Sequence, residues 1–251
     1  MKMFKVTGFV LKSYPFGESH KIINVLTKES GKMKIIARGV KKTSSKYGSS
    51  FELLNEVSLL LVPAKGNDLY DIRESSINTS YHHLREDLTS IKLIYYLVEF
   101  LDQMTQEDHH DVRVYDLLKN VLDRSLENIT PLYELTKSFI LKTLQMSGFL
   151  SDINECSHCS QKLQNQSNDS RKKIYISTRS GWIFCRNCHN QSIDQEISPG
   201  TYRFVVNLLN LEVDQVVRLK MNKFFKLETD NAIDKLITSI LGRKLKVIEW
   251  Q

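Results

Sequence analysis

Two Cys-x-x-Cys pairs limit the fold of this chain more than any other feature of its sequence. Cys156 and Cys159 form the first pair, Cys185 and Cys188 form the second, and the chain has no other cysteine. Two intervening residues let both sulfurs of a pair bind one ion from a tight turn, and two such pairs complete a tetrahedral sulfur site. The spacing therefore predicts one Zn²⁺ ion bound by all four cysteines, within a zinc-ribbon insert over residues 153–192.

Other arrangements of the cysteines are less suited to the sequence. The 25 residues between the pairs exceed the usual interval, and a polar stretch over 161–169 accounts for the excess. Two disulfides are an alternative that a reducing cytosol disfavours. His158 or His189, which flank the pairs, could replace one cysteine as ligand, although such rings more often lie outside the ligand set. Four thiolates leave no position for a substrate water, so the metal is expected to be structural.

The N-terminal third of the chain has the pattern of strands. Short runs rich in β-branched and aromatic residues alternate in polarity and are separated by glycine-containing turns. The expected strands cover 4–12, 21–27, 32–38, 55–62 and 69–77. Five short strands in about 80 residues suit a small closed barrel, of which the oligonucleotide-binding (OB) barrel is one common topology.

From residue 83 the apolar residues follow the period of helices. Helices are expected over 84–104, 112–127, 131–148, 200–211 and 229–241. The predicted fold class is therefore α+β. A five-stranded β-barrel over residues 1–80, for which the OB type is one candidate topology, precedes an α-helical domain over 81–251, into which the zinc ribbon is inserted.

The basic charge of the chain is segregated. Residues 1–82 carry 13 Lys and Arg against 7 Asp and Glu, whereas residues 83–155 carry 7 against 13. Segregated cations attract polyanions, of which nucleic acid is the commonest in a cell, although a solvated basic face is the alternative. The segment 32–47 contains the end of a strand and a polar loop, and it can place cations and hydroxyls along a phosphate backbone. Tyr14 and Tyr47 could add a face on which an unpaired base stacks. The candidate DNA contacts are Arg38, Lys41, Lys42 and Lys46, with Lys12 and Lys34 nearby.

The sequence contains no motif for catalysis. It lacks a GxxxxGK[ST] phosphate loop, a GxGxxG turn, HExxH, GxSxG and the deaminase HxE with PCxxC. No apolar run approaches the about 20 residues that span a bilayer, and the N-terminus has no apolar signal region. A non-enzymatic protein of the cytoplasm, associated with the nucleoid, is the resulting expectation.

Three N-terminal segments resemble the RecO family of bacterial recombination mediators and DNA repair proteins. These segments are 10–22 (VLKSYPFGESHKI), 26–32 (LTKESGK) and 37–46 (ARGVKKTSSK). The helices that follow, both cysteine pairs and the Gly181-Trp182 stretch extend the resemblance over nearly the whole chain. Some members of the family lack part of the cysteine set, which favours a stabilising role for zinc here.

The resemblance implies an OB barrel, a helical domain and a zinc ribbon. It further implies binding of single- and double-stranded DNA, annealing of complementary strands without ATP, and cooperation with RecR in loading RecA onto DNA coated by single-strand-binding protein. The acidic C-terminal tail of single-strand-binding protein would dock on the helical domain, although the net charge of −6 over 83–155 does not favour an acidic ligand. A protein-interaction scaffold without a direct DNA role is the competing hypothesis.

Overall fold

The chain forms two compact units. In this computed structural model the first unit extends from the N-terminus to Leu126 and the second comprises Glu127–Lys246. The residues that the structure describes are 3–41, 45, 47, 49–64, 69–107, 110–127, 131–163, 173–177, 183–192, 194–220 and 222–245. None of the described helices is both long and apolar enough to cross a membrane.

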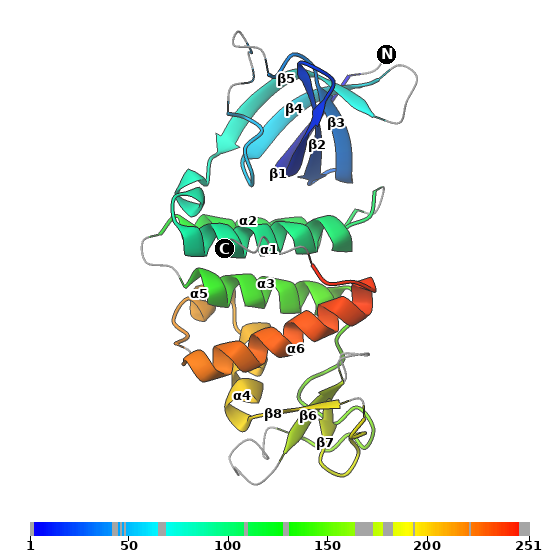
Figure 1. The fold of residues 1–251 in the computed structure, drawn as a ribbon, viewed down its shortest axis with the longest axis vertical. Coiled ribbons are helices and arrows are strands. Elements are labelled where there is room, and N and C mark those ends of the chain that lie inside the picture. Colours follow the sequence, from blue (N-terminus) through cyan, green and yellow to red (C-terminus); the bar gives the residue numbers. More distant parts are fainter. Residues whose placement is uncertain are drawn as a thin grey trace. The chain divides into compact units, whose positions relative to one another are not determined.

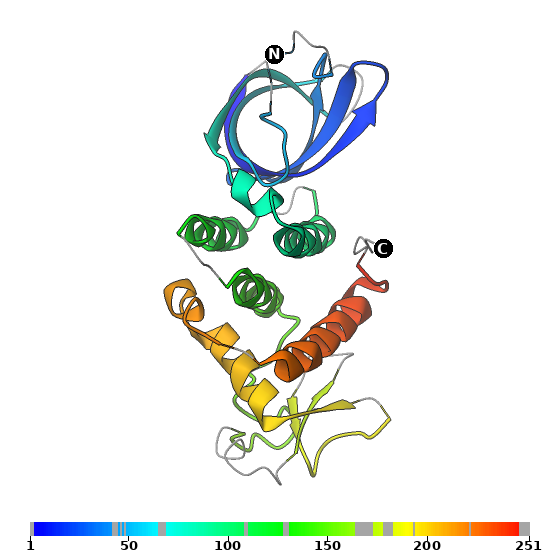
Figure 2. The same cartoon turned by 60° about the vertical axis from the view of Figure 1, so that its left-hand side comes forward.

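The first unit is built on a closed five-stranded barrel (Figure 1). Its strands are β1 (Phe4–Phe16), β2 (His20–Thr27), β3 (Gly31–Ala37), β4 (Glu56–Pro63) and β5 (Tyr70–Thr79). They join in the order β1-β2-β3-β5-β4, and Figure 2 shows the strands curling into a ring. All neighbouring strands are antiparallel except β3 and β5, which pair in parallel at Ile35–Tyr70 and Ile36–Asp71. The expected OB-type barrel is confirmed.

Alternation along each strand fills the barrel with apolar side chains. The interior is lined by Val6, Val10, Ile23, Val25, Met33, Ile35, Ala37, Val57, Leu59, Leu61 and Ile72, which are all buried. Tyr47 and Phe51 join this core, and their ring centroids are 5.5 Å apart. The predicted stacking role of Tyr47 is therefore wrong, because its ring is 7% exposed and its hydroxyl donates to the Ile72 carbonyl.

Gly8 is required where β1 and β2 approach most closely. A Cβ at this position would lie 2.5 Å from Val25 Cγ1 and 2.8 Å from the Leu26 carbonyl oxygen. We expect Gly8→Ala to lower the free energy of unfolding of the first unit by about 1–3 kcal/mol, since a packed core resists an added methyl group. Denaturant unfolding measures this, with Lys5→Ala on the exposed side of the same strand as a control. A Gly8→Ala protein as stable as wild type would contradict the close approach.

Two helices extend the first unit beyond the barrel. A 3₁₀ turn η1 (His82–Arg85) precedes α1 (Leu88–Met104), and α2 (Val112–Ser125) follows. The helix expected from residue 84 begins later because the Asp87 carboxylate caps it, accepting from the amides of Thr89 and Ser90.

Aromatic contacts attach the two helices to the barrel. The Phe9 ring on β1 lies 5.0 Å from the Tyr115 ring of α2, and the Tyr115 hydroxyl donates to Glu56 on β4. The last strand of the barrel ends at Thr79, while the compact unit continues to Leu126.

The second unit combines helices with a small sheet. Its helices are α3 (Leu132–Met146), α4 (Pro199–Asn210), α5 (Val213–Val216) and α6 (Lys223–Leu241), and the strands β6 (Ile174–Ser177), β7 (Ile183–Cys185) and β8 (Asp194–Ile197) pair in the order β7-β6-β8. The strand β8 and the short helix α5 were not expected. The helix expected from residue 229 begins at Lys223, where the Asn222 side chain accepts from the Phe224 amide, and it ends as expected at Gly242.

Candidate metal centre and nucleic-acid interface

The four cysteines converge in the second unit. Cys156 and Cys159 lie in a turn that the Ser160 amide closes on the Cys156 carbonyl, while Cys185 ends β7 and its carbonyl accepts from the Cys188 amide. The four sulfurs lie within 4.8 Å of one another, and those of Cys159 and Cys185 are 3.8 Å apart. Tetrahedral Zn²⁺ with Zn–S bonds of about 2.3 Å places its sulfurs about 3.8 Å apart. The cysteine geometry therefore fits one four-coordinate ion.

The electrostatics of the cluster also suit a cation. Burial raises the pKa of Cys156, but amide donors of Cys159, Cys185 and His158 outweigh it and lower that pKa to about 6. The hydrogen bond to Cys185 and the other nearby sulfurs raise the pKa of Cys188 to about 12. Without a positive charge between them, the four thiols thus cannot all ionise near neutral pH, whereas a bound metal ion holds all four as thiolates.

The alternatives left open by the sequence do not match the structure. All four cysteines are free, and a separation of 3.8 Å greatly exceeds the disulfide bond length. His189 stacks on Tyr175 with ring centroids 3.7 Å apart, and its Nδ1 hydrogen-bonds to the Arg186 carbonyl. Among the residues that the structure describes, only the four cysteines come together as metal ligands.

The candidate DNA contacts that the structure describes lie on the outer surface of the barrel, in two groups. Register places Lys12 on β1 beside Asn24 on β2, and Asn24 beside Lys34 on β3, so these three side chains form one row. Arg38 and Lys41 follow β3, next to the β1–β2 turn. Lys42 and Lys46 fall outside the residues that the structure describes.

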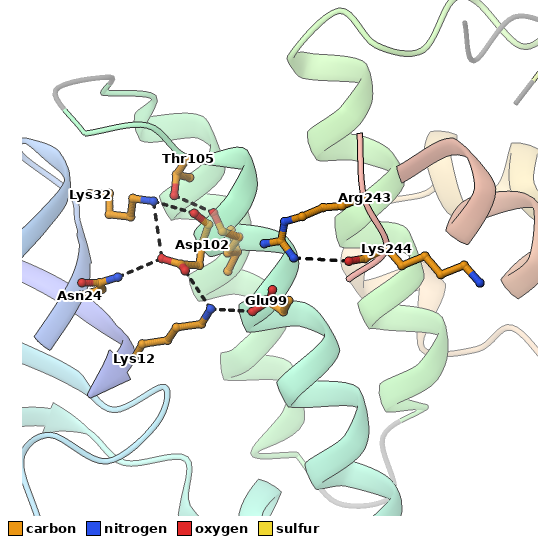
Figure 3. Close-up of polar contacts among 9 residues, drawn as sticks. Lys12, Asn24, Lys32, Glu99, Asp102, Thr105, Arg243 and Lys244 are labelled. Carbon is orange, nitrogen blue, oxygen red and sulfur yellow. Dashed lines mark hydrogen bonds and ion pairs between the residues drawn. The ribbon is translucent and has the colours of Figure 1, made fainter. Parts of the chain in front are cut away.

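Lys12 is engaged by carboxylates of α1 (Figure 3). Its ammonium lies 2.5 Å from Glu99 and 2.8 Å from Asp102, and its side chain is only 22% exposed. Asn24 donates to the Asp102 carboxylate at 3.1 Å, and Lys32 donates to the Asp102 backbone carbonyl at 2.6 Å. This Asp102 cluster, composed of Lys12, Asn24, Lys32, Glu99 and Asp102, joins the barrel to α1.

The remaining described candidates are more accessible. Lys34 pairs with Glu107 at 2.5 Å while its side chain stays 44% exposed. Arg38 is 54% exposed and pairs with Asp71 on β5 at 2.7 Å, and Lys41 donates to the Gly17 carbonyl at 3.2 Å. Among the candidates that the structure describes, Arg38 and Lys41 lie together, and neither belongs to the row of side chains that faces α1.

The β1–β2 turn is tied to the end of β3 by hydrogen bonds. The Gly39 amide donates to His20 Nδ1 at 2.9 Å, and the Lys41 amide donates to the Ser19 carbonyl at 3.1 Å. Phe16, which ends β1 beside this turn, is 45% exposed, and sequence reasoning did not select it. Alternation along the strand could have identified Phe16, since Lys12, Tyr14 and Phe16 occupy every second position and therefore share one face.

The fold and the cysteine cluster define the chain as an OB-barrel protein with an added helical unit in which four cysteines form a candidate metal site. Two family models match it: Recombination protein O N terminal over residues 1–81 and Recombination protein O C terminal over residues 85–248. The chain therefore belongs to the RecO family of DNA repair proteins.

Individual relatives span nearly the same length. The chain is 30% identical to the DNA repair protein RecO of Clostridium perfringens over 251 residues, which covers 99% of this chain and 97% of that protein. It is 28% identical to the DNA repair protein RecO of Dehalococcoides mccartyi over 249 residues, covering 98% and 94% respectively. The homologue of Alkaliphilus metalliredigens is 26% identical over 96% of this chain and 95% of its own.

Proposed function

We propose that this chain is a non-catalytic recombination mediator that binds single- and double-stranded DNA and anneals complementary strands without ATP. The observation that carries the proposal is the pair of exposed cations, Arg38 and Lys41, beside the first turn of an OB barrel. OB barrels bind oligonucleotides on the face of strands 2 and 3 and on the loop between strands 1 and 2. Lys42 and Lys46 continue the same basic segment in the sequence.

The ion pair of Arg38 leaves it available for phosphate. The Arg38 side chain is 54% exposed and the Asp71 side chain 19%, so water reaches the guanidinium and weakens the pair, and a DNA phosphate can compete with Asp71 for it. Cations that replace condensed counterions along two strands reduce the repulsion between their backbones. Annealing then needs no covalent step and no nucleotide hydrolysis.

Lys12 and Lys34, the two candidates in the row that faces α1, have different proposed roles. Lys34 is 44% exposed and can exchange Glu107 for a phosphate, so it extends the binding surface. Lys12 lies between two carboxylates that are each less than one-tenth exposed, so we assign it to holding α1 on the barrel.

The metal in the proposed mediator is Zn²⁺, bound by Cys156, Cys159, Cys185 and Cys188. Four thiolates match the preference of zinc for sulfur in closed structural sites. The ion would fix the loops around the three-stranded sheet, whose strands are too short to be stable alone. Its role is to stabilise the fold.

The partners follow from the family. We propose that the chain acts in the bacterial cytoplasm at the nucleoid, with RecR, on DNA coated by single-strand-binding protein, and so assists the loading of RecA. The C-terminal tail of single-strand-binding protein is expected to contact the helical unit.

The test is an annealing assay with two complementary strands, one coated with single-strand-binding protein, in the absence of ATP. Wild type is expected to accelerate duplex formation, and the acceleration should fade as salt rises. The Arg38→Ala/Lys41→Ala/Lys42→Ala variant should bind single strands at least about tenfold more weakly and lose about 2 from its log–log salt slope, because each lost phosphate contact removes about 0.7.

The matched control removes the same charge elsewhere. Lys5, Lys92 and Lys235 are exposed, and replacing all three by alanine should leave annealing nearly unchanged. Equal losses in both variants would show that only net charge matters. A folded wild-type protein that binds no DNA would instead favour the protein-interaction scaffold.

A further inference from the structure

We propose that Tyr14 and Phe16 form a platform on which unpaired nucleobases stack, so that the barrel binds single strands in preference to duplex. The inference rests on the DNA binding proposed above and adds the residues that recognise bases. It concerns a surface of the first unit alone.

Both rings stand on the open part of the barrel surface. Tyr14 and Phe16 alternate with Ser13 and Pro15 at the end of β1, so they share a face with Lys12, whose side chain points outward to α1. Each ring is 45% exposed, and they are the exposed aromatic side chains of the first unit within its described residues. Burial therefore does not explain two large aromatics at these positions.

Other aromatic side chains of the barrel are packed quite differently. Phe9 is fully buried against Tyr81 and Tyr115, and Tyr47 packs on Phe51 inside the core. Within the described part of the chain, no ring of another residue contacts Tyr14 or Phe16. With 45% of each residue exposed, part of each ring is accessible to a planar ligand.

Cations lie near the two rings. Lys41 reaches the carbonyl of Gly17, directly after Phe16. Lys34 on β3 is opposite Asn24, which is opposite Lys12, two positions before Tyr14 on the same face of β1. Cations beside exposed aromatic faces are the combination that proteins use to bind single strands, since the charges track phosphates while the rings accept bases.

The spacing of the rings favours a strand whose bases are separated. Two residues along a strand place the Cα atoms of Tyr14 and Phe16 about 7 Å apart. Bases in a double helix follow one another every 3.4 Å or so along each strand, with their faces covered. Two neighbouring rings at twice that spacing therefore suit bases that have left the stack. On the other side of Tyr14, the row of Lys12 and Asn24 is occupied by α1, so the open surface lies toward Phe16.

The test compares strands that differ only in their bases. The full-length wild-type protein is titrated with a fluorescent oligothymidylate, with an abasic deoxyribose–phosphate strand of the same length, and with a duplex. We expect wild type to prefer the oligothymidylate over the abasic strand by about tenfold or more, because a stacked base contributes substantially. Tyr14→Ala/Phe16→Ala should lose this preference while its affinity for the abasic strand and the duplex stays within about twofold of wild type.

Two further variants separate stacking from folding. Tyr14→Phe keeps the ring and should keep the preference, whereas Ile77→Ala removes an apolar side chain on β5 that is 40% exposed and should have no effect on it. Equal wild-type affinity for the thymidine and abasic strands overturns the inference while leaving the proposed DNA binding intact. Equal losses on all three ligands in the double variant also overturn it. Absence of wild-type binding to every strand overturns both proposals.

Discussion

Removal of the metal from the four-cysteine site is expected to unfold the β6–β8 sheet while the barrel stays folded. The three strands contain four, three and four residues, and the buried Cys156 and Cys185 form part of their core. Structural zinc contributes on the order of 10 kcal/mol to folding in small zinc domains, because the unfolded chain offers no preformed site. A fall of about 10 °C or more in the melting temperature of the second unit is therefore expected after chelation or in Cys185→Ser.

Hydrogen exchange can locate the unfolding. Amides of Ile174–Ser177 should lose protection when the metal is removed, whereas those of β2 and β3 should keep it, because the barrel has its own closed core. Metal analysis of the purified protein should give one zinc per chain, and His158→Ala and His189→Ala should retain it. A Cys185→Ser protein that keeps zinc and full stability would exclude the four-thiolate site.

The same variant separates the structural role of the metal from DNA binding. We expect Cys185→Ser to bind oligothymidylate with nearly wild-type affinity, since Arg38 and Lys41 belong to the first unit and Cys185 to the second. A large loss of affinity with an intact barrel would show that the metal-bearing unit takes part in DNA contact.

Local patterns in the sequence were sufficient to predict the barrel and the cluster of four cysteines. The strands follow a period of two that matches one buried face, and each cysteine pair fits a single turn. Both signals depend on residues close together in the chain. The number and length of the strands predicted a small closed barrel, whereas its OB topology was implied by the family resemblance.

Features set by distant partners were not predictable in this way. The sequence predicted Lys12 to be a cation available for DNA. Its partners Glu99 and Asp102 lie about ninety residues further along the chain, in α1. Tyr47 lies in a polar basic segment, yet its ring is inside the barrel. The strand β8 was missed because its residues Asp194–Ile197 are mostly polar and become a strand by pairing with β6. Tertiary pairing, rather than local propensity, decided each of these positions.

The Asp102 cluster should be the most sensitive polar contact of the first unit. Asp102→Asn would leave Lys12 and Lys32 beside a neutral amide in a site where the Asp102 side chain is only 9% exposed. Removing one partner of a buried ion pair destabilises proteins by about 3–5 kcal/mol, and the remaining Glu99 places the expected loss near the lower value. Urea unfolding of the first unit, followed by circular dichroism, measures this change.

The pH dependence of this loss has a definite sign. Burial raises the pKa of Asp102, but Lys12, Lys32 and Asn24 together lower it below its ordinary value. A carboxyl group with a lowered pKa in the folded state stabilises the fold above its unfolded pKa of about 3.9 and loses that contribution as the pH falls through the folded value. The difference between wild type and Asp102→Asn should therefore be constant at neutral pH and shrink below about pH 4.

An exposed ion pair in the same unit provides the control for Asp102→Asn. Asp116 pairs with Lys28 at 3.0 Å, with both side chains about half exposed, so Asp116→Asn should change stability by less than about 1 kcal/mol. A further variant, Lys12→Met, tests the role of Lys12. It should destabilise the first unit because it removes the cation that lies between the buried carboxylates of Glu99 and Asp102, yet it should bind DNA as wild type does. Weaker DNA binding by a folded Lys12→Met protein would return Lys12 to the DNA site and imply that α1 moves away from the barrel when DNA binds.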